Sequence, residues 1–261
     1  MGFANLEAYA TLESPLHRWT PRLKLVSLGI LMFAFAAVRQ LWLIPPMLLV
    51  VAIFYGVSRL PLGFLLNRLR YPGLFIAAVV ILLPLTSGET VVWQWGWLSL
   101  RLEGLEAMAL VVCRFLSILT LGFILLGTTP FLKLIRAMRA LRMPAILADM
   151  TLLSYRYLFE VADTLTTMQK AMGLRGFGQQ QGWLRLRTKT LKQLASLTGS
   201  LLIRSYERSE RVYKAMRLRG YGQLPQRLTD CQPMDSGSIV LTGITLTMAI
   251  GFFIAEIGLR P

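Results

Sequence analysis

The sequence is poor in the residues that usually hold metal ions or close disulfide bridges. It has one histidine, His17, and two cysteines, Cys113 and Cys231. Metal sites built from protein side chains draw mainly on clustered histidines, cysteines and carboxylates. We therefore expect no metal site, no cofactor and no disulfide framework, and we expect both cysteines to be free thiols.

Motifs that carry enzyme chemistry are also missing. The sequence has no GxxxxGK[ST] phosphate loop, no GxSxG nucleophile elbow, and no GxGxxG motif after a predicted strand. Clusters of acid, base and nucleophile are missing as well. We therefore expect that the chain is not an enzyme. Any ATP hydrolysis on which it depends must be carried out by a partner.

Acidic residues are scarce beside basic ones. The chain has 13 Asp and Glu against 28 Lys and Arg, a net charge of +15. Between Phe131 and Arg227 the count is 5 against 18, so this basic stretch carries +13. Such a bias is typical of cytoplasmic segments of membrane proteins, whose basic residues contact lipid head groups. We expect membrane lipids as contacts of the basic stretch and no nucleic acid.

Apolar residues dominate the rest of the chain. Hydrophobic residues make up 55% of the sequence, above the roughly 45–50% of soluble domains. Runs of about 17–25 such residues can cross a membrane as helices. Five runs qualify, namely 23–38, 41–57, 71–86, 105–127 and 239–257. The sequence therefore predicts an all-α, polytopic membrane protein with about five transmembrane helices and a helical module beside the membrane.

The distribution of basic residues predicts the orientation of the spans. With five spans, the N-terminal flank, the second loop and the basic stretch all fall on the same side of the membrane. These three regions are rich in Lys and Arg, which marks that side as cytoplasmic. Residues 1–20 lack the apolar core of a secretory signal, so the first span should remain as an anchor and the N-terminus should be cytoplasmic. We divide the chain into a membrane domain at 1–129, cytoplasmic helices at 130–227, and the last transmembrane helix at 228–261.

A charged residue, Arg114, falls within the fourth predicted span. A charge at that depth is costly and usually faces the interior of the helix bundle. A structural interhelical contact is the favoured interpretation, and a role in transport is the alternative. The sequence has no matching row of intramembrane carboxylates that would favour the second.

Three helices are predicted in the cytoplasmic segment. Apolar residues from Phe131 to Leu141 follow one helical stripe, and Pro144 begins a second helix that runs to about Leu174. A third helix is predicted over 183–218. Glycines follow the second and third helices. They indicate where each helix ends, because glycine takes the left-handed conformation that helix ends often require.

One ten-residue cassette occurs twice at the ends of these helices. Residues 170–179 read KAMGLRGFGQ and residues 214–223 read KAMRLRGYGQ, an offset of 44 with eight of ten positions identical. Each copy contains a Leu-Arg-Gly sequence at the predicted helix end. We call residues 174–176 the first tip and residues 218–220 the second tip. The repeat predicts a protein with two equivalent projecting contact points.

The residues alone leave two interpretations of the tips open. A cation in the last helical turn is stabilised by the helix dipole by about 0.3–1 kcal/mol, so Arg175 and Arg219 could be simple caps within packed helices. Docking into a groove of a partner also explains the recurrence of the alanines, Ala171 and Ala215, and of the neighbouring methionine and aromatic residues. Two equivalent tips suit a partner with two equivalent sites.

We expect the two helices to cross rather than to place the tips at opposite ends.

Taken together, these features resemble a known transporter family. The N-terminal string SPLHRWTPRLKL at 14–25, the spans, the basic helices and the two tips resemble the transmembrane T component of energy-coupling factor (ECF) transporters, most closely CbiQ of cobalt importers. The resemblance covers nearly the whole chain. The sequence departs from the family at WTPR, where LDPR is more usual, and in both tips, where leucine replaces the first alanine of an Ala-Arg-Gly signature.

The resemblance implies a non-catalytic scaffold in a bacterial plasma membrane. It would join a substrate-binding membrane subunit to two cytoplasmic ABC-type ATPase subunits, through a cytoplasmic helical coupling module. The positions implied in ATPase coupling are Ala171, Leu174, Arg175, Gly176, Ala215, Leu218, Arg219 and Gly220. Cobalt uptake, with its link to cobalamin biosynthesis, follows from the resemblance, and a nickel or vitamin importer is the alternative.

Two other classes of membrane protein remain as competitors. One is a membrane enzyme that acts on lipid-linked substrates at the basic face, and the other is a self-contained channel or carrier. The missing catalytic clusters disfavour the enzyme. The missing polar row within the spans disfavours the carrier.

Overall fold

The computed structural model of the chain describes residues 16, 19–59, 61–86, 91–95, 98–176, 186–222 and 236–258. By its internal contacts the chain divides into two compact units, Met1–Leu141 with Asp230–Pro261, and Arg142–Thr229. Cys113 is a free thiol, as predicted. The sequence expectations for His17 and Cys231 fall outside the described residues.

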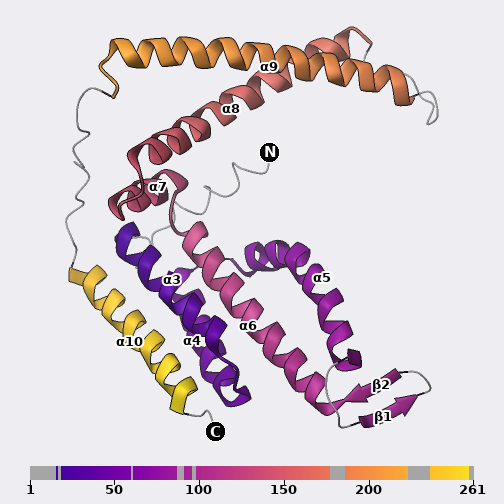
Figure 1. Ribbon diagram of the computed structural model, residues 1–261, viewed down its shortest axis with the longest axis vertical. Helices are drawn as coiled ribbons and strands as arrows, with labels where there is room; N and C mark the ends of the chain where they lie inside the picture. The colour runs from indigo at the N-terminus through magenta and orange to yellow at the C-terminus, as the bar shows by residue number, and fades with distance from the viewer. Residues whose placement is uncertain are drawn as a thin grey trace. The chain divides into compact units, whose positions relative to one another are not determined.

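The first unit is built from apolar helices. Its elements are α3 (Pro21–Ala37), the short 3-10 helix η1 (Leu41–Leu43), α4 (Ile44–Ser58), α5 (Leu62–Thr86), α6 (Leu102–Gly127), α7 (Phe131–Ala140) and α10 (Ser236–Gly258). Prolines lie in the first turn of α3 and of α4, where a missing backbone N–H costs nothing. Each of the five predicted spans is therefore helical (Figure 1).

Three helical stretches of the described residues are long and apolar enough to cross a membrane. They are Leu41–Ser58, Gly104–Gly127 and Ser236–Gly258. Helix α3 covers the first predicted span with 17 residues, and α5 covers the third with 25. The prediction of an all-α polytopic membrane protein is confirmed.

A short β-hairpin between α5 and α6 was not predicted. Strands β1 (Val91–Trp95) and β2 (Leu98–Arg101) pair antiparallel, with Gln94 opposite Ser99. Valine and tryptophan in β1 favour an extended backbone. The hairpin is a local addition to a helical fold.

Helix α3 is the central helix of the first unit. Its buried residues Leu28, Leu31 and Phe35 recur at intervals of three and four, which places them on one face. This face packs against α6, α7 and α10. The ring of Phe35 meets Phe252 of α10 edge to face, with centroids 5.1 Å apart.

The second unit consists of two long helices. Helix α8 spans Ala145–Leu174 and helix α9 spans Leu186–Leu218. The predicted end of each helix is confirmed, and so is the start of α8 after Pro144. The predicted start of the third helix at 183 lies outside the described residues.

Candidate functional site

The first tip ends helix α8 with a left-handed glycine. Leu174 is the last helical residue, Arg175 caps the helix, and Gly176 has φ +86°. The N–H of Gly176 donates to the carbonyl oxygen of Gly173 at 3.1 Å, and the N–H of Arg175 donates to that of Met172 at 3.0 Å. Gly176 therefore ends the helix in the conformation that the sequence predicted.

The second tip repeats this geometry at the end of helix α9. The N–H of Gly220, with φ +78°, donates to the carbonyl oxygen of Arg217 at 3.0 Å. The N–H of Tyr221 donates to the carbonyl oxygen of Met216 at 3.1 Å. These two bonds are the pair that defines a Schellman motif. The sequence repeat is therefore also a structural repeat.

Both tips present an apolar side chain and a guanidinium group to solvent. The exposed fraction is 92% for Leu174 and 90% for Leu218, and both arginines are exposed. Within the described part of the chain, the guanidinium groups of Arg175 and Arg219 have no hydrogen-bond or ion-pair partner. Leucines this exposed stabilise nothing in the unit itself, so helix packing does not account for them.

The remaining positions of the cassette divide into two sets. Ala171 and Ala215 are exposed, whereas Met172 and Met216 are half-buried. The alanine and leucine therefore lie on the open side of each helix end, and the methionine lies on the side turned toward the unit. Small and apolar groups beside an arginine form a surface that a partner groove can enclose.

The two helices run antiparallel where they meet. The guanidinium of Arg208 on α9 is ion-paired with the carboxylate of Glu160 on α8. Further along, the hydroxyl of Tyr221 donates to Oδ2 of Asp149 at 3.0 Å. The second tip therefore lies beside the start of α8. Asp149 and the first tip are separated by about 39 Å of helix, since each residue adds about 1.5 Å.

This arrangement corrects one expectation about the tips. The helices contact each other, but antiparallel pairing leaves the tips at opposite ends of the helix pair, which the sequence analysis had excluded. The contacts that accompany this arrangement, Arg208 with Glu160 and Tyr221 with Asp149, join residues far apart in the chain, and no local pattern encodes them. The two tips are therefore well separated from each other.

A buried lysine in the N-terminal string was missed by sequence reasoning. Lys24 is 1% exposed, and its ammonium donates to the Leu16 carbonyl oxygen at 2.9 Å and to the Thr129 hydroxyl oxygen at 3.1 Å. It also bonds to the hydroxyl and the carbonyl oxygen of Thr128. Lys24 lies four residues before Leu28 on the buried face of α3, and this spacing is the signal that could have identified it.

The same N-terminal string holds the start of helix α10. The indole N–H of Trp19 donates to the hydroxyl oxygen of Thr242 at 3.0 Å, and the backbone N–H of Thr20 donates to the hydroxyl oxygen of Ser238 at 3.1 Å. Lys24 meanwhile bonds the turn between α6 and α7. The string therefore joins three elements of the first unit.

Arg114 makes an interhelical contact. Its guanidinium donates to the carbonyl oxygen of Val38 at the end of α3. The next residue, Arg39, donates its backbone N–H to Oε2 of the buried Glu256 on α10 at 3.0 Å. The end of α3 is thus bonded to both α6 and α10, in line with the structural interpretation of Arg114.

Comparison with known proteins identifies the family. Residues 13–230 match the family model of CbiQ, described as cobalt transport protein. The chain is 27% identical over 269 residues to the energy-coupling factor transporter transmembrane protein EcfT of Limosilactobacillus fermentum, with 96% of each chain covered. It is 27% identical over 259 residues to EcfT of Macrococcus caseolyticus, with 94% of this chain and 96% of the relative covered. Since the family match includes the N-terminal string and both tips, the chain belongs to the CbiQ family.

Proposed function

We propose that the chain is the transmembrane coupling subunit of an ECF-type importer. It is multi-pass with a cytoplasmic N-terminus, catalyses no reaction itself, and joins two ABC-type ATPase subunits to a substrate-binding membrane subunit. The similarity to energy-coupling factor transporter transmembrane proteins supports the transporter class. The single observation that carries the ATPase contact is the repeated, solvent-exposed Leu-Arg-Gly tip.

The tips suit contact with two separate ATPase subunits. Each offers an unpaired guanidinium for carboxylate or carbonyl acceptors and an exposed leucine for an apolar groove. The antiparallel helices direct the tips to opposite ends, so each ATPase receives one tip. The Ala171 and Ala215 positions allow close approach of the groove walls because their side chains are small.

Coupling then follows from a difference in binding between two states. When ATP closes the ATPase pair, the two grooves move toward each other and carry the tips with them. The helices transmit this movement to the membrane helices and to the substrate-binding subunit. The tips contribute to transport only insofar as the ATPases hold them differently in the open and closed states.

The experiment is a double substitution, Arg175→Ala with Arg219→Ala, in the complete transporter. Loss of both guanidinium groups should abolish co-purification of the ATPases or reduce uptake at least tenfold, because a desolvated arginine at an interface centre typically contributes about 2 kcal/mol or more, roughly thirtyfold in affinity. The membrane-inserted amount of the protein should be unchanged. The measurements are ATPase co-purification and substrate uptake.

A matched control removes one basic side chain from each helix away from the tips. Arg156→Ala with Lys192→Ala makes the same change in charge, and both side chains are exposed. This control should keep both the ATPases and uptake. Normal co-purification and uptake by the tip variant would refute the proposed role of the tips.

We also propose cobalt ion as the cargo, because the matching family is that of cobalt transport proteins. The alternatives are a nickel or a vitamin importer, in which the substrate-binding subunit would differ. Uptake of radiolabelled cobalt by cells that hold the complete transporter, with nickel and vitamins as competitors, tests the cargo. Uptake of nickel or of a vitamin in place of cobalt would overturn it without affecting the coupling role.

A further inference from the structure

A cavity lies between the two helices of the second unit, away from the tips. It has a volume of about 400 Å³ and opens to solvent. Its lining residues are Val161, Thr164, Leu201, Arg204, Ser205, Glu207, Arg208 and Arg211. Three of the eight are arginines, and two, Val161 and Leu201, are aliphatic. The cavity therefore combines basic side chains with a smaller apolar portion.

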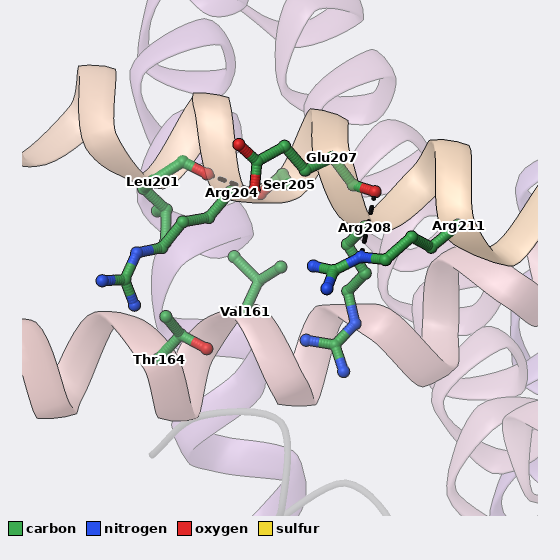
Figure 2. A pocket seen from close by; sticks show the side chains of 8 residues that line it. All are labelled: Val161, Thr164, Leu201, Arg204, Ser205, Glu207, Arg208 and Arg211. Carbon is green, nitrogen blue, oxygen red and sulfur yellow. Dashed lines mark hydrogen bonds between the residues drawn. The ribbon is translucent and has the colours of Figure 1, made fainter.

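The three arginines belong to one face of helix α9. Positions 204, 208 and 211 are four and three residues apart, so their side chains emerge on the same side of the helix. Figure 2 shows the guanidinium groups of Arg204 and Arg211 extending into the space between the helices, with Val161 of α8 between them. The like charges repel one another unless an anion balances them.

The chain itself supplies only part of that balance. Arg208 is ion-paired with Glu160 and lies over the ring of Tyr157, 5.7 Å from its centroid. Within the described residues Arg204 and Arg211 have no carboxylate partner. Glu207 also lines the cavity, and Figure 2 shows its carboxylate in front of the α9 ribbon near Ser205.

The lining selects a phosphate-bearing ligand. Arginine presents a planar fork of N–H donors that matches phosphate oxygens, and two such forks can hold different oxygens of one group. The hydroxyls of Thr164 and Ser205 already donate to the carbonyl oxygens of Glu160 and Leu201, and each keeps lone pairs only. The arginines therefore offer the donors that a phosphate group needs, and Val161 and Leu201 offer apolar surface beside them.

We propose that this cavity binds the phosphate group of an anionic ligand through Arg204 and Arg211, with Arg208 fixed beside them by Glu160. An anionic phospholipid head group fits the combination of phosphate charge and apolar remainder, and a soluble phosphate is the other source of the same chemistry. The site is independent of the tips, so its presence or absence has no bearing on the ATPase contact.

The experiment measures ligand adducts on the full-length protein in detergent by native mass spectrometry. The probes are phosphatidylglycerol, phosphatidylcholine and inorganic phosphate. Phosphatidylglycerol should bind at least tenfold more tightly than phosphatidylcholine. The double substitution Arg204→Gln with Arg211→Gln should weaken phosphatidylglycerol binding by roughly tenfold or more, since both basic groups that attract the anionic head group are removed.

Two further variants separate a built site from general basicity. Lys192→Gln with Lys214→Gln removes the same charge from the same helix and should change binding less than threefold. Val161→Glu places a carboxylate inside the cavity and should weaken binding as the arginine variant does. Circular dichroism checks that each variant keeps its helices.

Each outcome decides for or against the site. If inorganic phosphate binds the protein and this binding is lost in the arginine variant, the site is supported. If phosphatidylglycerol then does not compete with phosphate, the ligand is a soluble phosphate. Competition by phosphatidylglycerol at lower concentration assigns it to lipid. Equal weakening by the lysine control, or undiminished binding by the arginine variant, overturns the proposal.

Discussion

The ammonium nitrogen of Lys24 lies 3.1 Å from the hydroxyl oxygen of Thr129, and no carboxylate of the described residues pairs with it. The two residues are 105 positions apart and join the first turn of α3 to the turn between α6 and α7. A buried cation is stable only where oxygen acceptors replace its water. Lys24 therefore holds in place the turn from which the chain continues toward helix α8.

Replacing Lys24 by Met should lower the stability of the first unit. Met keeps the length and apolar stem of the side chain, but the Leu16 carbonyl and the Thr129 hydroxyl lose their donor. Relief of the buried charge offsets part of this loss, so we expect a net cost of about 1–3 kcal/mol. Thermal unfolding in detergent, followed by tryptophan fluorescence, measures it.

The exposed Lys192 provides the control for that measurement. Lys192→Met should change the free energy of unfolding by less than about 0.5 kcal/mol, because the side chain is in water in both states. An equal or higher Tm for Lys24→Met would show that removing the buried charge outweighs the lost hydrogen bonds.

Two glycines near the first tip should respond in opposite directions to the same substitution. Gly176 has φ +86°, where an added Cβ costs about 1–2 kcal/mol, although nothing lies within 4 Å of that position. Gly173 is inside α8 with equally open surroundings, so alanine there should stabilise the helix by up to about 1 kcal/mol.

Amide hydrogen exchange over the end of α8 distinguishes the two variants. Exchange should become faster in Gly176→Ala and slower in Gly173→Ala. The two substitutions add the same atoms at positions three residues apart, so a common effect of volume cannot give opposite signs. The same direction in both would contradict the left-handed helix end.

Local signals in the sequence were enough to predict the helices and their ends. The end of α8 at Leu174 follows from Gly176, because glycine readily adopts the left-handed conformation of a helix end, and its start follows from Pro144, because proline fixes φ. The family also follows from contiguous strings. These features depend on residues that are neighbours in the chain.

The pairing of distant residues could not be predicted in this way. From the sequence, Lys24 is one of the basic residues of the N-terminal flank, and only the fold brings Thr128 and Thr129 to it. The antiparallel arrangement of the tips depends on Asp149 and Tyr221, which are 72 positions apart. The sequence repeat indicated that two tips exist but held no information on their spacing.

The tyrosine that distinguishes the second cassette from the first should hold the second tip in place. The first copy has Phe177 at the corresponding position, and the additional hydroxyl of Tyr221 donates to Asp149 at 3.0 Å. Tyr221→Phe should therefore loosen the second tip at a cost of about 0.5–1.5 kcal/mol.

A double-mutant cycle with Asp149→Ala isolates this contact from the other interactions of the two residues. The coupling energy, taken from hydrogen exchange over residues 215–222, should be about 0.5–1 kcal/mol. Lys192→Gln combined with Tyr221→Phe serves as a non-contacting pair and should be additive. Additive effects in the cycle with Asp149 would show that the hydroxyl contributes nothing to the position of the tip.

The buried Glu256 on α10 should be replaceable by glutamine but not by leucine. Its Oε2 accepts the backbone N–H of Arg39 at 3.0 Å, and the side chain is 4% exposed. The glutamine side chain would keep an amide oxygen as acceptor, so Glu256→Gln should cost less than about 1 kcal/mol. Glu256→Leu leaves the N–H of Arg39 without a partner and should cost about 1–3 kcal/mol.

Thermal unfolding of the two variants in one detergent gives the difference between their free energies of unfolding. Both substitutions remove the same charge, so the loss of charge does not contribute to this difference. If leucine were tolerated as well as glutamine, the end of α3 would be held by Arg114 and by apolar packing, and the bond to α10 would be dispensable.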